Sequence, residues 1–217
     1  MIITVFLVDD HTVVRDGLRF LLEAQPDIRV VGGAADGRAA VAGIANMCPN
    51  IVLMDVTMPE LNGIEATAHI HQACPVSQVI ILSMHANIQH VSRAIQAGAR
   101  GYLLKESAGS EVVAAVRTVY EGHRYLSRKL SEALIEERLL PAKERAADSP
   151  LSRLSLRERE VMQLTVEGKS NSEIAEILSL SRKTVETYRS RLMQKLEIYE
   201  IPSLVKFAIQ HQLTPIE

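Results

Sequence analysis

Residues 51–63 read IVLMDVTMPELNG, and this stretch decides the fold. Its first four residues are apolar and end in Asp55, while Pro49-Asn50 precedes them and a Pro/Gly stretch follows. A short run of Ile, Val and Leu between turn-forming residues is typical of a strand buried on both faces, as in a parallel sheet covered by helices. We therefore expect Asp55 at the carboxyl end of a parallel strand, where open α/β sheets place their chemistry.

Polar side chains end three further apolar runs in the same way. The run 5–8 ends in Asp9-Asp10, the run 79–82 in Ser83, and the run 101–104 in Lys105. Carboxylates from two strand ends suit a hard cation such as Mg²⁺. With a hydroxyl and an ammonium beside them, they suit phosphoryl transfer to Asp55, which attacks in line while metal and Lys105 offset the charge. Each residue alone has an ordinary explanation as a cap, a turn residue or a solvated strand end. Their combination favours a site for phosphoryl transfer over these separate explanations.

The first part of the chain alternates between strand and helix patterns. Strands are predicted near residues 3–9, 28–34, 50–55, 78–83 and 100–104, with amphipathic helices between them and a last helix that stops at Gly122. Such alternation predicts a five-stranded parallel sheet, doubly wound with helices on both faces.

The last part of the chain is predicted to be all-helical. Two capping boxes, Ser155 with Glu158 and Ser170 with Glu173, predict helices that begin at about 156 and 171. A third helix follows Ser181, ends near residue 196 and buries residues 185, 188, 192 and 196. A short helix, a tight turn and a longer helix form a helix-turn-helix. A short helix over 129–140 and a linker over 142–150 are predicted before this part.

Positive charge gathers on the third of these helices. Residues 151–217 hold ten Lys or Arg against nine Asp or Glu, which by itself says little. Within residues 182–195, however, only Glu186 opposes five basic residues: Arg182, Lys183, Arg189, Arg191 and Lys195. A basic helix directly after a helix-turn pair indicates a reader of the DNA major groove.

Composition points to a cytoplasmic protein. The chain has 217 residues, 47% of them hydrophobic, and no apolar run approaches the ~20 residues that span a membrane. The N-terminus shows no export signal. Cys48 and Cys74 lack the paired spacing of a zinc site, and we expect them to be reduced thiols.

The residues at the strand ends resemble the receiver domain of bacterial response regulators. The resemblance covers residues 1–121 and rests on Asp9-Asp10, on Asp55 with Met58-Pro59 and Gly63, on Ser83, and on AGARGYLLK at 97–105. It implies a flavodoxin-like fold, Mg²⁺ as cofactor, a sensor histidine kinase as partner, and these roles: phosphoacceptor Asp55; catalytic Ser83 and Lys105; switch residues Ser83 and Tyr102; metal ligands Asp9, Asp10, Asp55 and the carbonyl of Thr57. In such receivers Thr57 and His85 flank the path of the water that removes the phosphoryl group. Glu106 stands where many receivers carry Pro.

The helical part resembles the four-helix LuxR-type DNA-binding domain. The motifs are LSLREREV at 154–161, GKSNSEIA at 168–175 and TVETYR at 184–189. The resemblance implies that Glu186, Thr187 and Ser190 read bases, that Arg182, Lys183 and Arg191 bind phosphates, with Thr184 beside them, and that a fourth helix over 203–212 pairs domains on DNA. Glu186 and Tyr188 stand where Lys and His are common.

Together the two parts resemble NarL/FixJ-type response regulators. The predicted organisation is a receiver over 1–121, a linker with a short helix over 122–150, and a LuxR-type helix-turn-helix domain over 151–217. This resemblance implies a transcription regulator rather than an enzyme. Phosphorylation of Asp55 would control homodimerisation and binding to double-stranded DNA, and RNA polymerase is a further partner that it allows.

Two alternatives remain open from the sequence. One is an aspartyl-phosphate phosphatase of the haloacid-dehalogenase type, which also uses a strand-end Asp, Mg²⁺ and Lys; those enzymes need a second Asp at the position that Thr57 occupies. The other is a DNA-binding protein whose receiver is never phosphorylated and serves only for dimerisation. The acidic pair, Ser83 and Lys105 argue against that second alternative.

Overall fold

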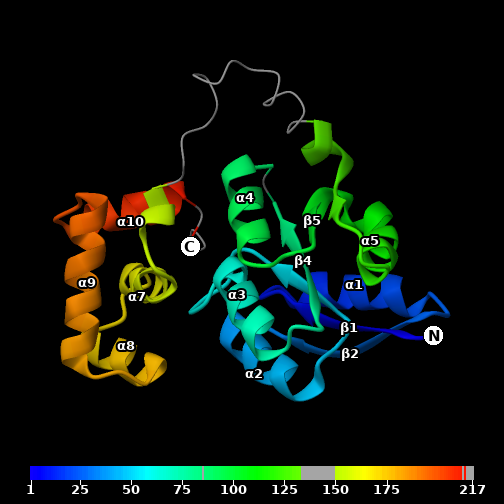
Figure 1. The fold of residues 1–217 in the computed structure, drawn as a ribbon, viewed down its shortest axis with the longest axis horizontal. Coiled ribbons are helices and arrows are strands. Elements are labelled where there is room, and N and C mark those ends of the chain that lie inside the picture. The colour runs from blue at the N-terminus through cyan, green and yellow to red at the C-terminus, as the bar shows by residue number, and fades with distance from the viewer. Residues whose placement is uncertain (85, 133–149, 212, 214–217) are drawn as a thin grey trace.

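The computed structural model describes residues 1–84, 86–132, 150–211 and 213, and it forms two parts, a sheet with helices and a bundle of helices (Figure 1). The strands are β1 (Ile3–Val8), β2 (Ile28–Ala34), β3 (Ile51–Asp55), β4 (Gln78–Ser83), β5 (Gly101–Leu104) and β6 (Tyr125–Leu126). The helices of the first part are α1 (Thr12–Glu23), α2 (Gly37–Met47), α3 (Gly63–Ala73), α4 (Ile88–Gln96) and α5 (Lys105–Tyr120).

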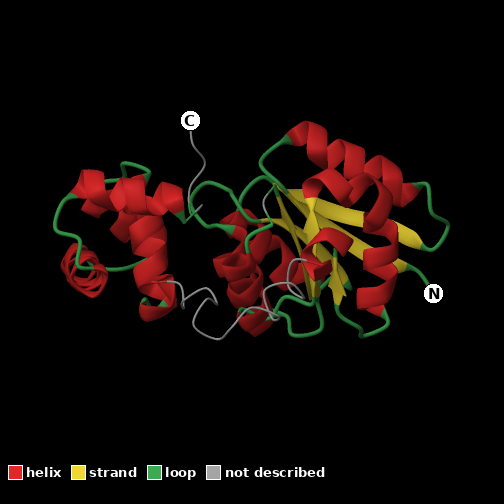
Figure 2. Cartoon of the chain, turned by 90° about the horizontal axis from the view of Figure 1, so that it is seen from above, coloured by secondary structure: helices red, strands yellow, loops and turns green. Residues whose placement is uncertain are grey.

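The sheet is parallel, with the strand order β2-β1-β3-β4-β5-β6. Helices cover both of its faces (Figure 2). Successive side chains of a strand point to opposite faces, so each strand serves two cores. One core joins the sheet to α2, α3 and α4, and the other joins it to α1 and α5. The predicted doubly wound fold is confirmed.

The sheet has one strand more than predicted. β6 contains only two residues, and it pairs in parallel with β5, Gly101 opposite Tyr125 and Tyr102 opposite Leu126. Two residues are too few to show an alternating pattern, so periodicity gave no signal for this strand.

Four helices form the second part: α7 (Leu156–Val166), α8 (Asn171–Leu178), α9 (Arg182–Leu196) and α10 (Ile201–Gln210), preceded by a 3₁₀ turn over Pro150–Arg153. Both predicted capping boxes are present, at Ser155 and at Ser170. Val185 and Leu192 of α9 are buried, whereas Tyr188 and Leu196 are only partly buried, in a third core separate from the sheet.

The region between the two parts is described only at its edges. Residues 128–132 are helical, as predicted for 129–132, and Leu130 is buried against the sheet. The rest of the predicted helix over 129–140, the linker except for Pro150, and Gln212 at the end of the predicted fourth helix lie outside the described residues.

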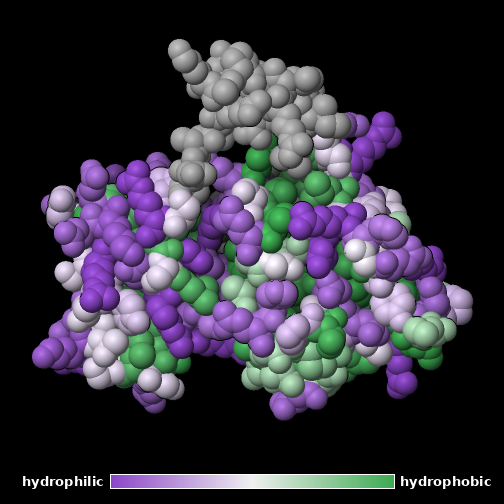
Figure 3. Space-filling view, in the orientation of Figure 1, coloured by the Kyte–Doolittle hydropathy of each residue, from purple (hydrophilic) through white to green (hydrophobic). Residues whose placement is uncertain are grey.

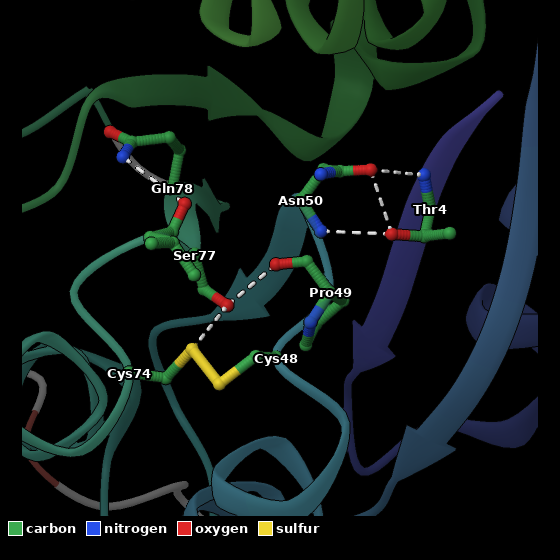
Figure 4. Close-up of a disulfide and its surroundings, with 8 residues drawn as sticks. Thr4, Cys48, Pro49, Asn50, Cys74, Ser77 and Gln78 are labelled. Atoms are coloured by element: carbon green, nitrogen blue, oxygen red, sulfur yellow. Dashed lines mark hydrogen bonds between the residues drawn. A yellow bond between two sulfur atoms is a disulfide. The ribbon is translucent and has the colours of Figure 1, made fainter. Parts of the chain in front are cut away.

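The expectation of two reduced cysteines is wrong, because Cys48 and Cys74 form a disulfide (Figure 4). Each cysteine caps the C-terminus of a helix, Cys48 that of α2 and Cys74 that of α3. The two helices pack side by side on one face of the sheet, which brings the Cα atoms to 5.8 Å, a usual disulfide separation. Spacing along the sequence, 26 residues, gave no sign of this.

No helix among the described residues is both long and apolar enough to cross a membrane. Hydrophilic residues cover much of the face of the molecule that is seen in Figure 3.

Candidate functional site

Three carboxylates meet at the carboxyl edge of the sheet, as predicted. Asp9 and Asp10 follow β1, and Asp55 is the last residue of β3. One oxygen of each lies within 4.8 Å of the others and of a ring nitrogen of His11. Asp9 and Asp55 are 1% and 4% exposed. Acidic oxygens so closely grouped and withdrawn from water repel one another unless a cation joins them, and hard oxygen ligands suit Mg²⁺.

His11 was missed in the sequence. Its side chain is exposed, its Nδ1 lies 2.6 Å from Asp10 Oδ1, and its backbone amide donates to Asp9 Oδ1 at 2.9 Å. The only available signal was its place directly after Asp9-Asp10.

Lys105 brings the positive charge into this group. It is the first residue of α5, and its Nζ lies 2.7 Å from Asp9 Oδ2 and 2.8 Å from Asp55 Oδ2. The side chain is only 12% exposed, so it is not a solvated strand end. One ammonium therefore pairs with the carboxylates at the ends of two strands.

The protonation of the site follows from its burial. Burial raises the pKa of Asp55 to about 6: the neighbouring Asp9 and Asp10 carboxylates add to this effect, and Lys105 opposes it. Burial also disfavours the charged form of Lys105, but the Asp55 and Asp9 carboxylates outweigh it and raise the pKa of the ammonium. The ion pair is thus not enough to offset the desolvation of Asp55. Lys105 keeps its proton at neutral pH, and Asp55 is mostly ionised there.

Ser83 and Tyr102 lie together inside the same domain. Ser83 ends β4 and is 3% exposed, while Tyr102 on β5 is fully buried. Burial raises the pKa of Tyr102 to about 12, and a hydrogen bond with Ser83 works in the opposite direction. The ring of Tyr102, expected to be a switch residue, lies inside the domain in this structure.

The segment from Val56 to Asn62 joins Asp55 to α3 and carries Thr57, which is half-buried. Gly63 must be glycine, since a Cβ there would lie 1.8 Å from the Asp55 carbonyl oxygen. Asn62 caps α3 by accepting from the amides of Ile64 and Glu65. His85, the second residue expected to flank the water path, lies outside the described residues.

The predicted DNA-reading residues lie on or at the start of α9, and all of them are exposed except Thr184, which is partly buried. Lys183, Thr184, Thr187 and Arg191, with Ser181 and Tyr188, line a shallow hollow of about 400 Å³. Glu186 pairs with Arg182 one turn away on the same helix, with Arg182 Nε 3.3 Å from Glu186 Oε1.

Two of the five basic residues counted on this helix have partners on other helices of the same part. Arg189 donates to Asn171 Oδ1 on α8 at 3.1 Å, and Lys195 Nζ lies 2.6 Å from Glu158 Oε2 on α7. They hold the helices of this part together. The charge offered to a partner is therefore centred on Lys183 and Arg191, with Arg182 beside them.

Polar residues of α7 contact the first part of the chain, and no sequence pattern revealed them. Glu160 is fully buried, with its carboxylate 2.6 Å from His69 Nε2 on α3. Arg159 Nε lies 2.8 Å from Glu65 Oε1, which also binds Arg93 at 2.6 Å. Gln163 is fully buried as well. These partners are about 90 to 100 residues apart in sequence, a distance over which periodicity carries no information.

Two family models match the chain. One, described as "Response regulator receiver domain", matches residues 5–117, and the other, "Bacterial regulatory proteins, luxR family", matches residues 152–208. Response regulator UvrY of Escherichia coli (strain K12) is 40% identical over 215 residues, which are 99% of this chain and 97% of that protein.

Solved structures agree. A two-component response regulator of the LuxR family from Aurantimonas sp. SI85-9A1 is 38% identical with a TM-score of 0.62, over 64% of this chain and 100% of that one. The response regulator RcsB in its DNA complex is 25% identical with a TM-score of 0.59, over 96% of this chain and 98% of that one. The chain therefore belongs to the NarL/FixJ family of two-component response regulators, in which a receiver domain precedes a LuxR-type DNA-binding domain.

Proposed function

We propose that a sensor histidine kinase phosphorylates this cytoplasmic regulator on Asp55 in a Mg²⁺-dependent reaction, and that the phosphoryl group controls dimerisation and binding to double-stranded DNA. The observation that carries the proposal is the position of Lys105 Nζ, within 2.8 Å of both Asp9 and Asp55 at the edge of the sheet. The proposed domains are a receiver over 1–121, a linker over 122–150 and a DNA-binding domain over 151–217.

In the reaction, a carboxylate oxygen of Asp55 attacks the phosphorus of the kinase phosphohistidine. The P–N bond breaks, its electron pair returns to the imidazole, and an acyl phosphate forms on Asp55. Lys105 and the hydroxyl of Ser83 bind the phosphoryl oxygens and hold them in place. Asp55 must be ionised to attack; burial raises its pKa to about 6 without metal, and a bound cation would favour the ionised form.

The acidic cluster fits a divalent cation. Asp9, Asp10 and Asp55 provide closely grouped carboxylate oxygens. We assign the backbone carbonyl of Thr57 as a further ligand of the cation. Bound Mg²⁺ would neutralise charge on the carboxylates and on the phosphoryl oxygens. The residues of the chain would supply the nucleophile and hold the phosphoryl group in line.

Ser83 and Tyr102 would report the phosphorylated state. When the Ser83 hydroxyl donates to a phosphoryl oxygen, its hydrogen bond with the Tyr102 hydroxyl would change. The surface formed by α4 and β5 would change with it. Because Tyr102 is already fully buried, this change would not need its ring to turn inward.

DNA would be bound through α9. Arg182, Lys183 and Arg191 would contact phosphates, while Glu186, Thr187 and Ser190 would face base edges, with Thr184 at the start of the helix. Two half-sites, and therefore a homodimer paired through α10, would provide specific affinity. RNA polymerase would then be the partner through which bound dimers act.

The test is phosphorylation by acetyl phosphate with Mg²⁺, followed by intact mass and by sedimentation. One phosphoryl group should be added to the wild type and none to Asp55→Asn, and only the phosphorylated protein should gain dimer and DNA affinity together. Phosphorylation that persists in Asp55→Asn, or that proceeds equally well with a chelator, contradicts the assignment.

A further inference from the structure

The segment that follows Asp55 is held by the DNA-binding domain. Gln163 of α7 accepts through its Oε1 from the backbone amide of Asn62 at 2.9 Å and from Asn62 Nδ2 at 3.0 Å. Its Nε2 donates to the carbonyl oxygen of Met58 at 2.9 Å. One fully buried amide therefore satisfies both ends of the five-residue stretch 58–62.

Glu167, one helical turn further along, holds the middle of the same stretch. The amide of Glu60 donates to both of its carboxylate oxygens, at 3.1 and 3.2 Å, and Gln163 Nε2 donates to its Oε1 at 2.9 Å. We name Gln163 and Glu167 the loop clamp. Burial raises the pKa of the Glu167 carboxyl, which is the cost of placing this acid inside the contact.

The clamped stretch includes a backbone conformation that needs support. Glu60 has φ of 63°, in the left-handed region that non-glycine residues seldom adopt. A residue there costs roughly 1–2 kcal/mol unless its surroundings fix it. The clamp bonds the amide of this same residue.

Other contacts hold the two domains together without the clamp. Glu160 pairs with His69, and Arg159 pairs with Glu65, both along α3. A change at Gln163 should therefore loosen the stretch 58–62 before it separates the domains. The clamp bonds the 58–62 stretch itself, whereas these other contacts bond α3.

We infer that Gln163, supported by Glu167, is a positioning residue for the phosphorylation site: from the DNA-binding domain it holds the stretch after Thr57 so that the site binds its divalent cation more tightly. The inference rests on the proposed function, because the Thr57 carbonyl is taken as a ligand there. Thr57 is bonded directly to Met58, whose carbonyl Gln163 holds. Fixing a ligand-bearing stretch beforehand removes an ordering cost from binding.

The experiment uses the full chain and compares Gln163→Glu with Gln194→Glu, which adds the same charge to the same domain at an exposed position. Gln163→Glu keeps the shape but turns the donor toward the Met58 carbonyl into an anion beside Glu167. A second variant, Glu167→Ala, removes the acceptor of the Glu60 amide and leaves Gln163 in place. Mg²⁺ binding is followed by calorimetry, and phosphorylation by acetyl phosphate over a range of Mg²⁺ concentrations by intact mass.

We expect Gln163→Glu to raise the Mg²⁺ dissociation constant about fivefold, or about 1 kcal/mol. The half-saturating Mg²⁺ concentration should rise by the same factor, while the rate at saturating Mg²⁺ stays near that of wild type. Glu167→Ala should show a smaller change in the same direction. Hydrogen exchange of the Asn62 amide should speed up in Gln163→Glu and that of the Glu60 amide in Glu167→Ala, whereas slow exchange in the β3 strand of both variants would show that the receiver remains folded.

Unchanged or tighter Mg²⁺ binding in Gln163→Glu, with faster exchange at Asn62, would overturn the inference. So would an equal effect of Gln194→Glu, because charge alone would then explain the result. Failure of the wild type itself to accept a phosphoryl group would instead contradict the proposed function. The two failures are thus distinguishable.

Discussion

Replacing Asp55 with Asn should stabilise the receiver at neutral pH and not at pH 4. Folding raises the pKa of Asp55 from 3.8 to about 6 in the absence of metal, because the side chain is buried beside two other carboxylates. The folded chain then holds this proton more tightly than the unfolded chain. The stability linked to it is fully present below the unfolded pKa and is lost as pH rises through 6. Asn does not titrate and escapes this loss.

The size of the effect follows from the shift. At about 1.36 kcal/mol per pH unit, the rise of the Asp55 pKa from 3.8 to about 6 corresponds to about 3 kcal/mol at pH 7 and above, and to well under about 1 kcal/mol at pH 4. Effects of the substitution on packing are the same at each pH, and the ion pair with Lys105 is already included in the pKa of Asp55, so the difference between the two pH values isolates the charge.

Urea unfolding followed by circular dichroism, with a chelator present, measures this difference; the chain has no tryptophan for fluorescence. Asp16→Asn on the exposed side of α1 is the matched control and should show no comparable pH dependence. Mg²⁺ should narrow the gap at pH 7, since a bound cation favours ionised Asp55. A gap of equal size at pH 4 and pH 7 would refute the reasoning.

Three further predictions concern single contacts. Lys105→Met should leave Asp55 in place but reduce phosphorylation by acetyl phosphate at least tenfold, measured by intact mass, because the phosphoryl oxygens lose their cation; an undiminished rate would contradict the assigned role. Arg191→Ala should weaken binding to all DNA sequences and lower the slope of log affinity against log salt concentration by about one per protomer. Glu186→Ala should instead relax the preference at one base pair per half-site, worth about 1–3 kcal/mol. If binding sites selected from random DNA by wild type and Glu186→Ala give the same consensus sequence, Glu186 is a surface charge. Reducing the Cys48–Cys74 bond, which closes a span of 26 residues, should lower the unfolding free energy by about 3 kcal/mol in urea, and the Cys48→Ser variant should respond to neither oxidant nor reductant.

The sheet and the residues at its edge could be predicted because the end of each strand is marked locally in the sequence. β1, β3 and β4 are short apolar runs that stop at a polar residue, and parallel strands place those stops at one edge. The starts of α7 and α8 were equally local, since a Ser and a Glu three residues apart fix each of them.

Pairings between distant residues could not be predicted in this way. Glu160 and Gln163 look like the polar face of an amphipathic helix, yet both are fully buried because α3 and the 58–62 stretch cover them. Cys48 and Cys74 likewise carry no pairing signal until the packing of α2 against α3 is known. A sequence pattern reports which face of a helix avoids water within its own domain. It does not report which second domain will cover the other face.

Helix α7 contacts both the stretch that follows Asp55 and helix α9. On one side, Gln163 and Glu167 hold the stretch after Asp55; on the other, Glu158 binds Lys195 of α9 at 2.6 Å. If the clamp raises cation affinity at Asp55, then the cation must strengthen the clamp by the same factor, because coupling between two binding equilibria is reciprocal. Loosening the clamp would therefore weaken the cation site, and a bound cation would in turn hold the clamp in place. Cation binding at Asp55 and the position of the DNA-binding domain would then be coupled through α7, which contacts both the 58–62 stretch and α9.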